Sequence, residues 1–227
     1  MKVLAFDCSG EVLSVAVRDG GSWAEASLDF GLRHAERLMD LVDRCLAWAG
    51  IRPAELGLIA CTIGPGSFTG LRIGISTAKG MALGLGVPWV GVPSLDCLAW
   101  GHEANEGPVA PIMDARRGRV YSAIYLRGRR ISDWLDLPLA ELAALLDTYP
   151  QALVTGPDAE LFEPYAADRS GFRIDPRARQ SAARALAVLG EARFAAEGGA
   201  KEDAGPLYLR PVEADRAGPP PGAGTTE

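Results

Sequence analysis

The chain has 227 residues and a formal net charge of −6, so it is long enough for one domain or for two compact lobes of about 100 residues each. Because the charge is negative, no overall positive field attracts nucleic acid or an anionic membrane, and any RNA contact must be local or supplied by a partner. No apolar run approaches the roughly 20 residues that cross a bilayer. We therefore expect a soluble, cytoplasmic protein without membrane contact.

The cysteines and histidines indicate no redox or metal centre. Cys8, Cys45, Cys61 and Cys97 form no CxxC pair, and each lies among apolar residues. This is typical of small core residues in a reducing cytosol. Since the chain has only two histidines, we expect no catalytic metal site.

The N-terminal half reads as strands followed by two helices. Residues 3–7 are an apolar run ending in Asp7, and 12–17 and 23–28 continue as strands separated by tight turns. Residues 34–49 carry apolar side chains at helical spacing and end at a glycine. A buried strand at 56–64 leads into a second helix, which runs to about residue 86.

A related unit returns in the C-terminal half. Residues 110–114 again form an apolar run ending in Asp114, followed by a turn and a strand at 120–126. A helix at 139–146, a strand at 152–156 and a long helix at 177–197 follow. The repetition favours an α/β fold made of two lobes that arose by duplication, although any two buried hairpins look alike at this level. We divide the chain into an N-terminal lobe (1–100), a C-terminal lobe (101–213), whose last helix could pack back on the first, and a disordered tail (214–227).

Asp7 and Asp114 stand where kinases and ATPases of the actin and sugar-kinase type place their metal-organising carboxylates. A small-molecule kinase is therefore the alternative function, with Asp7 organising magnesium and Asp114 acting as base. The loop after the first aspartate, Cys8-Ser9-Gly10, is a poor phosphate cradle. Turn capping by each aspartate is the favoured interpretation.

The stretch GPGSFTGLRIG (64–74) has the glycines of a phosphate-binding loop without the Walker lysine. Glycine or alanine recurs every fourth residue from Gly66 to Gly86. Glycine inside a helix costs about 1 kcal/mol relative to alanine, so another backbone must come close to this helix. The helix is also apolar on nearly all sides. These features favour an interface with another protein over internal burial, with predicted interface residues Leu38, Met39, Leu41, Val42, Gly70, Gly74, Ala78, Met81 and Ala82.

One basic concentration interrupts the acidic chain. It comprises two groups of arginines at the ends of one predicted hairpin. Such a cluster is usually a solvated rim, and a contribution to RNA binding is the alternative. Its members are Arg116, Arg117, Arg119, Arg127, Arg129 and Arg130.

Five segments carry a resemblance to a known family. They are LAFDCSGEVLSVAV, RHAERLMDLVDRCL, GPGSFTGLRIGISTAKGMALGLGVPWVGVPSLD, MDARRGRVYSAIY and GPLYLRP. In these segments the chain resembles the TsaB/YeaZ family, which takes part in forming N6-threonylcarbamoyladenosine beside the tRNA anticodon. The resemblance covers nearly the whole chain except the tail.

The resemblance implies a fold of two ribonuclease-H-like lobes, as in actin and the Hsp70 ATPase, with mixed sheets flanked by helices. It further implies a scaffold subunit without catalytic activity or a cofactor of its own. Its partners would be a TsaD-like catalytic paralogue, bound through the first two helices, and a TsaE-like ATPase. A homodimer through the same helices is expected when the chain is alone, a nucleotide near the interface is conceivable, and tRNA contact is left open. The two-histidine metal motif of the paralogue has no counterpart, since His34 and His102 lie far apart.

Overall fold

Apolar strands of the N-terminal half pair into a five-stranded sheet in the order β3-β2-β1-β4-β5. The structure, a computed structural model, describes residues 1–31, 33–167, 171–175 and 181–210. β1, β2 and β3 pair antiparallel, whereas β4 and β5 continue the sheet parallel to β1. The strands of this first lobe are β1 (Lys2–Asp7), β2 (Val12–Asp19), β3 (Ser22–Asp29), β4 (Leu58–Gly64) and β5 (Trp89–Pro93).

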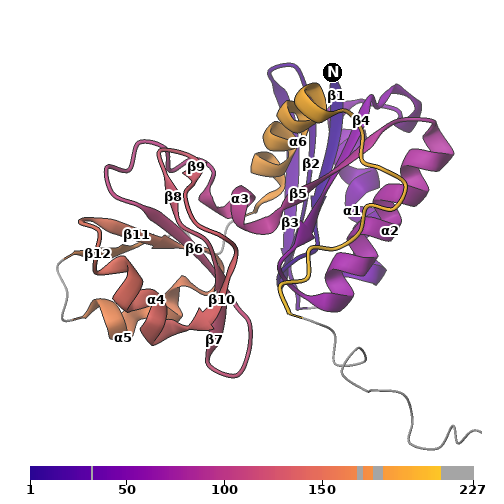
Figure 1. Ribbon diagram of the computed structural model, residues 1–227. Helices are drawn as coiled ribbons and strands as arrows, with labels where there is room; N and C mark the ends of the chain where they lie inside the picture. The colour runs from indigo at the N-terminus through magenta and orange to yellow at the C-terminus, as the bar shows by residue number, and fades with distance from the viewer. Residues whose placement is uncertain (32, 168–170, 176–180, 211–227) are drawn as a thin grey trace, which may run out of the picture.

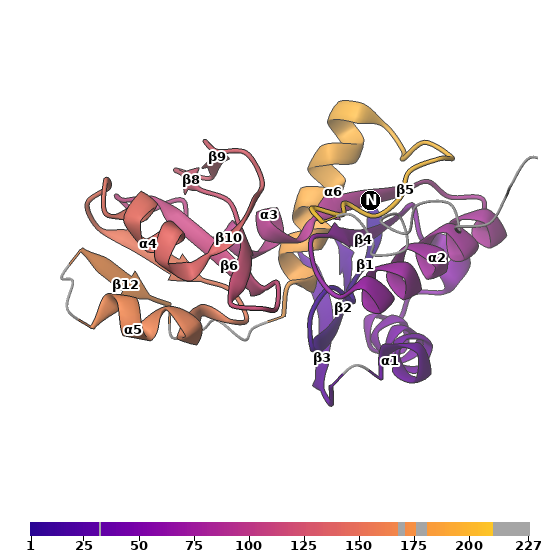
Figure 2. The same cartoon turned by 60° about the horizontal axis from the view of Figure 1, so that its bottom comes forward.

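Helices cover both faces of this sheet because successive side chains of β1 point to opposite sides. Leu4 and Phe6 pack in the same cluster as the buried side chains of α1 and α2, whereas Val3 and Ala5 pack with those of α6. Figure 2 accordingly shows α1 and α2 together on one face and α6 on the other. The bounds are α1 (His34–Ala49), α2 (Phe68–Leu85) and α6 (Ala183–Glu197), with a short 3-10 helix η1 (Pro53–Glu55) after α1.

The ends of these helices follow the sequence pattern. α1 ends at Gly50 and α2 at Gly86, both at positive φ, a conformation that glycine adopts without strain. The start of the last helix differs from the prediction: α6 begins at Ala183. Residues 176–180, where we placed its first turn, lie outside the described residues.

The second sheet, in the other lobe, has the path β10-β7-β6-β11-β12, with β8 and β9 attached beside β6 (Figure 1). β6, β7 and β10 pair antiparallel and β11 and β12 run parallel to β6, which is the pattern of the first sheet. The mixed α/β class is therefore confirmed, while an origin by duplication stays a prediction. The elements are β6 (Val109–Asp114), β7 (Arg119–Ser122), β8 (Tyr125–Leu126), β9 (Arg129–Arg130), β10 (Leu135–Pro138), α4 (Leu139–Leu146), β11 (Ala152–Thr155), η2 (Ala159–Phe162), α5 (Glu163–Ala166) and β12 (Phe172–Ile174).

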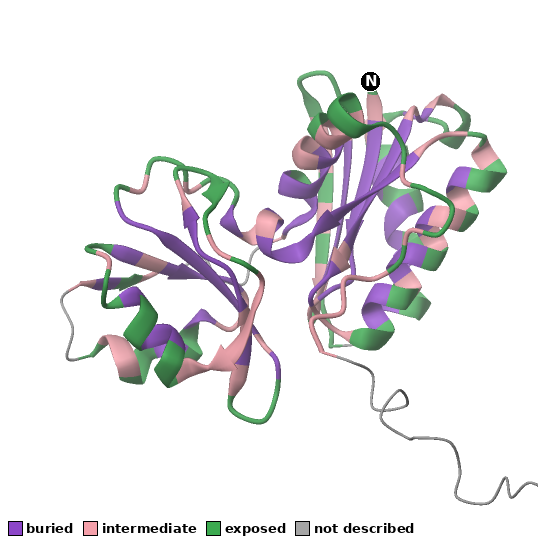
Figure 3. Ribbon diagram, viewed as in Figure 1, coloured by how far each residue is buried: buried purple, intermediate pink, exposed green. Residues whose placement is uncertain are grey.

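α3 (Ser94–Ala99) lies where the chain passes from the first lobe to the second (Figure 3). Leu95 and Ala99 of α3 share a buried cluster with Val109 and Met113 of β6, whereas Cys97 of α3 lies in the cluster of the first sheet and α6. α3 therefore packs on both lobes. The proposed boundaries of 1–100 and 101–213 stay predictions. The predicted tail, 214–227, lies outside the described residues.

All four cysteines are buried with free thiols, as predicted. Burial is the largest cause that raises the pKa of Cys45 to about 11, so this thiol stays protonated at neutral pH. Within the described part of the chain, no helix is both long and apolar enough to span a bilayer.

Candidate functional site

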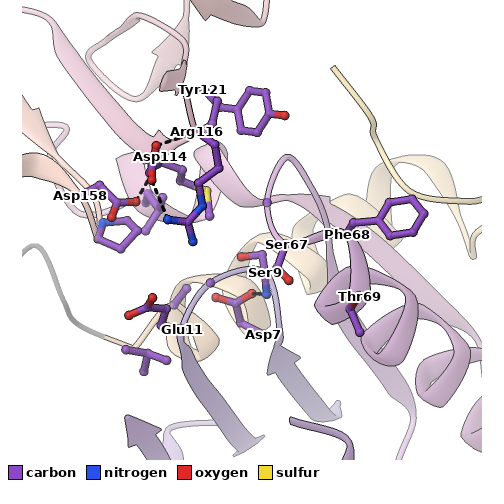
Figure 4. A pocket seen from close by; sticks show the side chains of 18 of the residues that line it. Asp7, Ser9, Glu11, Ser67, Phe68, Thr69, Asp114, Arg116, Tyr121 and Asp158 are labelled. Atoms are coloured by element: carbon purple, nitrogen blue, oxygen red, sulfur yellow. Dashed lines mark hydrogen bonds and ion pairs between the residues drawn. The ribbon is translucent and has the colours of Figure 1, made fainter. Parts of the chain in front are cut away.

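A cleft of about 430 Å³ lies between the lobes (Figure 4). Its walls come from the loops after β1 and β6, the first turn of α2 and the loop before η2. These are the places where the sequence puts its strand-end acids and its glycine-rich stretch. The polar side chains along the walls are Asp7, Ser9, Glu11, Asp29, Ser67, Thr69, Asp114, Arg116, Tyr121 and Asp158.

Asp7 joins the turn after β1 to strand β4 of its own lobe. One of its carboxylate oxygens, Oδ1, accepts hydrogen bonds from the backbone amide of Ser9 (2.8 Å) and from the hydroxyl of Thr62 (2.6 Å). The residue is only 7% exposed. Such contacts are those of a turn-capping aspartate, which agrees with the favoured interpretation of the sequence.

Asp114 is bound in a similar way at the end of β6. Its Oδ1 accepts from the backbone amide of Arg116 at 2.7 Å, and its Oδ2 forms an ion pair with the Arg116 guanidinium at 3.1 Å. The backbone amide of Asp114 in turn donates to Asp158 Oδ2 at 2.7 Å. Figure 4 shows these three side chains together on the second-lobe wall of the cleft.

The described residues around the cleft carry five carboxylates, on Asp7, Glu11, Asp29, Asp114 and Asp158, and one guanidinium, on Arg116. The negative charge of these side chains repels phosphate groups unless cations neutralise it. Among the described residues there is no group of three or more His, Cys, Asp or Glu side chains that could hold a metal ion. The negative charge of the cleft and the hydrogen bonds that Asp7 and Asp114 accept from their own turns do not favour the kinase alternative, in which these two aspartates would work on a bound nucleotide.

The glycines of GPGSFTGLRIG are explained by a contact within the chain. A Cβ at Gly70 would clash with the backbone carbonyl oxygen of Cys8, and one at Gly66 would clash with that of Ser9. The Ser67 amide donates to the Ser9 carbonyl at 2.7 Å, and the Ser67 hydroxyl accepts from the Gly70 amide at 3.2 Å, capping α2. The close backbone is therefore the β1–β2 turn, and our inference that it belongs to another polypeptide was wrong for these glycines.

Most of the residues predicted at a partner interface lie in the core of the first lobe. Only Met39, which is 45% exposed, and the half-buried Met81 retain accessible side chains. The other seven predicted interface residues are buried against their own chain and are not available to a partner, because each helix turns its apolar stripe toward the sheet. These seven are Leu38, Leu41, Val42, Gly70, Gly74, Ala78 and Ala82.

The accessible face of the same two helices carries other residues, which the sequence reasoning missed. Trp48 on α1 is 63% exposed and Leu83 on α2 is 87% exposed. A Cβ at Gly80 or Gly84 would meet no atom within 4 Å, so these glycines leave a flat, open strip on α2. The signal was present in the sequence, since Gly80 and Gly84 are four residues apart, but it could not be separated from the buried glycines without the fold.

Three of the six arginines in the basic cluster contact side chains of the second lobe. Arg119 pairs with Asp136 of β10 at 2.7 Å, and Arg116 pairs with Asp114 as described above. Arg130 lies over the ring of Trp134, 3.9 Å from its centroid. These contacts fit a solvated rim, and an RNA role for the cluster stays untested.

Comparison with known proteins decides the family. The chain is 31% identical over 231 aligned residues to the tRNA threonylcarbamoyladenosine biosynthesis protein TsaB of Bacillus subtilis, across 95% of this chain and 96% of that protein. The chain belongs to the TsaB family. The TsaB protein of Escherichia coli is 38% identical over 130 residues, 56% of either chain. Residues 30–187 also match the family model TsaD, described as tRNA N6-adenosine threonylcarbamoyltransferase, and the chain belongs to that family as well.

Solved structures agree with this assignment. YeaZ from Pseudomonas aeruginosa superposes on this TsaB-family chain with a TM-score of 0.78 and 30% identity, over 92% of this chain and 99% of that one. The TsaB/YeaZ resemblance stated from the sequence is thereby confirmed. A ROK hexokinase from Thermus thermophilus superposes with a TM-score of 0.51 at 14% identity, covering 86% of this chain and 100% of that one. At that identity the likeness concerns the fold alone, and it supports the expected actin-like and sugar-kinase-like architecture.

Proposed function

We propose that this chain is the non-catalytic subunit that pairs with a TsaD-type transferase to form N6-threonylcarbamoyladenosine in tRNA. The names of its relatives support a role in that modification, and the match to the TsaD family supports pairing between two chains of related fold. The observation that carries the proposal is the exposed surface of α1 and α2, where three large apolar side chains, Met39, Trp48 and Leu83, lie outside the core.

The chemistry of that face suits a helical partner. Large apolar side chains that project from two neighbouring helices are the anchors expected of a protein interface. The open strip at Gly80 and Gly84 lets the backbone of another helix approach α2 closely. The partner is therefore expected to present helices of its own, and a second copy of this chain would meet the same requirement when the paralogue is absent.

The cleft supports a non-catalytic role for the chain itself. Asp7 and Asp114 accept hydrogen bonds from their own loops, so each acts as a structural residue there. Within the proposal, the paralogue supplies the metal and the transfer chemistry, and a TsaE-type ATPase joins the pair. The proposal leaves open whether a nucleotide binds near the subunit interface and whether this chain contacts tRNA directly. It places the complex in the cytoplasm.

The test is binding to the TsaD-type protein of the same organism, measured by titration calorimetry. Leu83→Asp places a charge at the most exposed apolar residue of α2, so we expect affinity to fall about tenfold or more. Leu161→Asp is the matched control, because Leu161 is a leucine on the second lobe that is 39% exposed. Unchanged affinity of the Leu83 variant would contradict the proposed face.

A second readout separates the proposal from the kinase alternative. The purified chain should not turn over ATP with a sugar or other small hydroxyl acceptor, whereas mixing it with its paralogue should support tRNA modification. Turnover by the chain alone that disappears in Asp114→Asn would favour the kinase.

A further inference from the structure

After α6 the chain runs back across the first lobe (Figure 1, yellow). Two backbone hydrogen bonds fasten this return: the Ala200 amide donates to the Trp89 carbonyl, and the Leu207 amide donates to the Ile63 carbonyl, each at 2.7 Å. The first lies on β5 and the second on β4. Residues 200–207 therefore belong structurally to the first lobe.

The next residue is held by the start of α2. The ring of Tyr208 stacks on that of Phe68 with 5.3 Å between centroids. Arg72, one turn further along α2, donates to the Tyr208 hydroxyl at 3.1 Å and lies 3.8 Å from the centroid of the Phe68 ring. Phe68 also lines the cleft, so this three-residue stack sits at the cleft margin.

Two residues later the chain contacts the other lobe. The Arg210 guanidinium donates to both carboxylate oxygens of Asp136 on β10, at 2.9 and 3.0 Å. It also donates to the carbonyl of Ala115, in the loop after β6, at 3.2 Å. Ala115 and the neighbouring Tyr121, whose ring centroid is 6.0 Å from the Arg210 guanidinium carbon, both line the cleft.

The chemistry of this contact favours a fixed geometry. Arginine binding a carboxylate through two parallel hydrogen bonds is directional as well as charged. Burial raises the pKa of Asp136, but hydrogen bonds and charge from Arg210 and Arg119 outweigh burial and hold that pKa below its ordinary value. Asp136 is therefore ionised at neutral pH.

We propose that residues 205–210 are a latch across the cleft, in which Arg210, anchored to the first lobe, fixes the position of the second. Two lobes that are connected by short chain segments and a small interface are expected to move relative to each other. Among the described residues, the bidentate pair with Asp136 connects the lobes in addition to α3. Arg210 acts here as a positioning residue. Because Tyr208 is stacked on the first turn of α2, the latch also links lobe position to the helix that we propose as the partner surface.

The experiment measures the distance between lobes by double electron–electron resonance. Spin labels at Ser22→Cys and Ala144→Cys report on the two lobes, since both positions are exposed, while the four native cysteines are buried. Labelled chain is diluted with unlabelled chain so that only distances within one molecule contribute. The variants are Arg210→Gln and Asp136→Asn in this background.

Arg18→Gln is the matched control. Arg18 forms an ion pair with Glu191 at 2.7 Å, with side chains 26% and 30% exposed, against 29% and 18% for Arg210 and Asp136. That pair lies wholly within the first lobe, between β2 and α6. The control removes the same charge and a similar contact without touching the second lobe.

We expect a broader distance distribution in both latch variants and an unaltered one in Arg18→Gln. Raising the salt concentration should broaden the distribution of the otherwise unaltered chain, because the pair is partly exposed and is screened. If Asp136→Asn impairs folding of β10, Arg210→Gln decides the question, since Arg210 follows the last strand and helix. A distribution in Arg210→Gln identical to that of the unaltered chain would overturn the latch.

Discussion

At the scale of single residues, four glycines in and just before α2 fall into two groups. Gly66 and Gly70 let the start of the helix rest on the carbonyl oxygens of the β1–β2 turn, where no Cβ fits. Gly80 and Gly84 have open space around them. The same residue type therefore serves internal packing in the first turns of α2 and leaves accessible backbone in the last turns.

The two groups make opposite predictions for alanine. Gly70→Ala gains about 1 kcal/mol of helix propensity, but the clash with the Cys8 carbonyl exceeds that gain, so we expect a net destabilisation of about 1–3 kcal/mol. Gly80→Ala meets no clash and should stabilise the chain by about 0.5–1 kcal/mol. Urea unfolding followed by circular dichroism measures both. A Gly70 variant as stable as the Gly80 variant would refute the contact.

At the scale of elements, α3 lies between the two sheets in the chain and packs on both lobes, with Cys97 in the cluster of the first sheet and α6, and Leu95 and Ala99 in the cluster of β6. Besides its apolar contacts with β6, it accepts a hydrogen bond at Asp96 Oδ1 from the Tyr125 hydroxyl of β8, at 2.6 Å. Burial is the main cause that raises the pKa of Asp96 and that of Tyr125. This polar pair therefore lies in a partly desolvated contact between α3 and the second sheet.

Tyr125→Phe removes the hydroxyl that donates to Asp96 and leaves the Asp96 carboxylate partly buried without this hydrogen bond. We expect a loss of about 1–3 kcal/mol in the free energy of unfolding, measured with urea. The double variant Asp96→Asn, Tyr125→Phe should lose less than the sum of the two single changes, because the second change no longer breaks an existing contact. Additive losses would show that the hydrogen bond contributes nothing to the attachment of α3.

At the scale of the whole molecule, each lobe has a core of its own. Phe162 is fully buried in a cluster made only of second-lobe residues, and its ring packs edge-on against Phe172, with centroids 5.4 Å apart. Leu38 of α1 lies in a cluster confined to the first lobe and the chain segment that returns to it. Among the described residues, the lobes are joined through α3 and the Arg210 pair.

Phe162→Ala should therefore destabilise the second lobe selectively, by about 3–5 kcal/mol. Amide hydrogen exchange followed by mass spectrometry should show loss of protection in residues 109–166, with β1 and α1 retaining theirs. Leu38→Ala is the reciprocal variant and should expose the first lobe instead. Equal loss of protection in both lobes for either variant would mean that the molecule unfolds as one unit.

The amino-acid sequence by itself determined the local structure and the family. Helices α1 and α4 were predicted with their observed bounds, because apolar spacing and terminal residues such as Gly50 are local signals. Asp7 and Asp114 were correctly interpreted as turn caps, since each caps an amide two residues away. The motif GPGSFTGLRIG was specific enough to identify relatives before any fold was known.

Only the tertiary structure decided what each surface contacts. α2 is apolar on nearly all sides, so its sequence could not tell the sheet-facing stripe from the accessible one, and the predicted interface therefore included Gly70 and Gly74, which pack on Cys8. The pair of Arg210 with Asp136 joins residues 74 positions apart, and no periodicity encodes such a contact. Spacing along a chain specifies elements, whereas contacts between elements depend on how the whole chain packs.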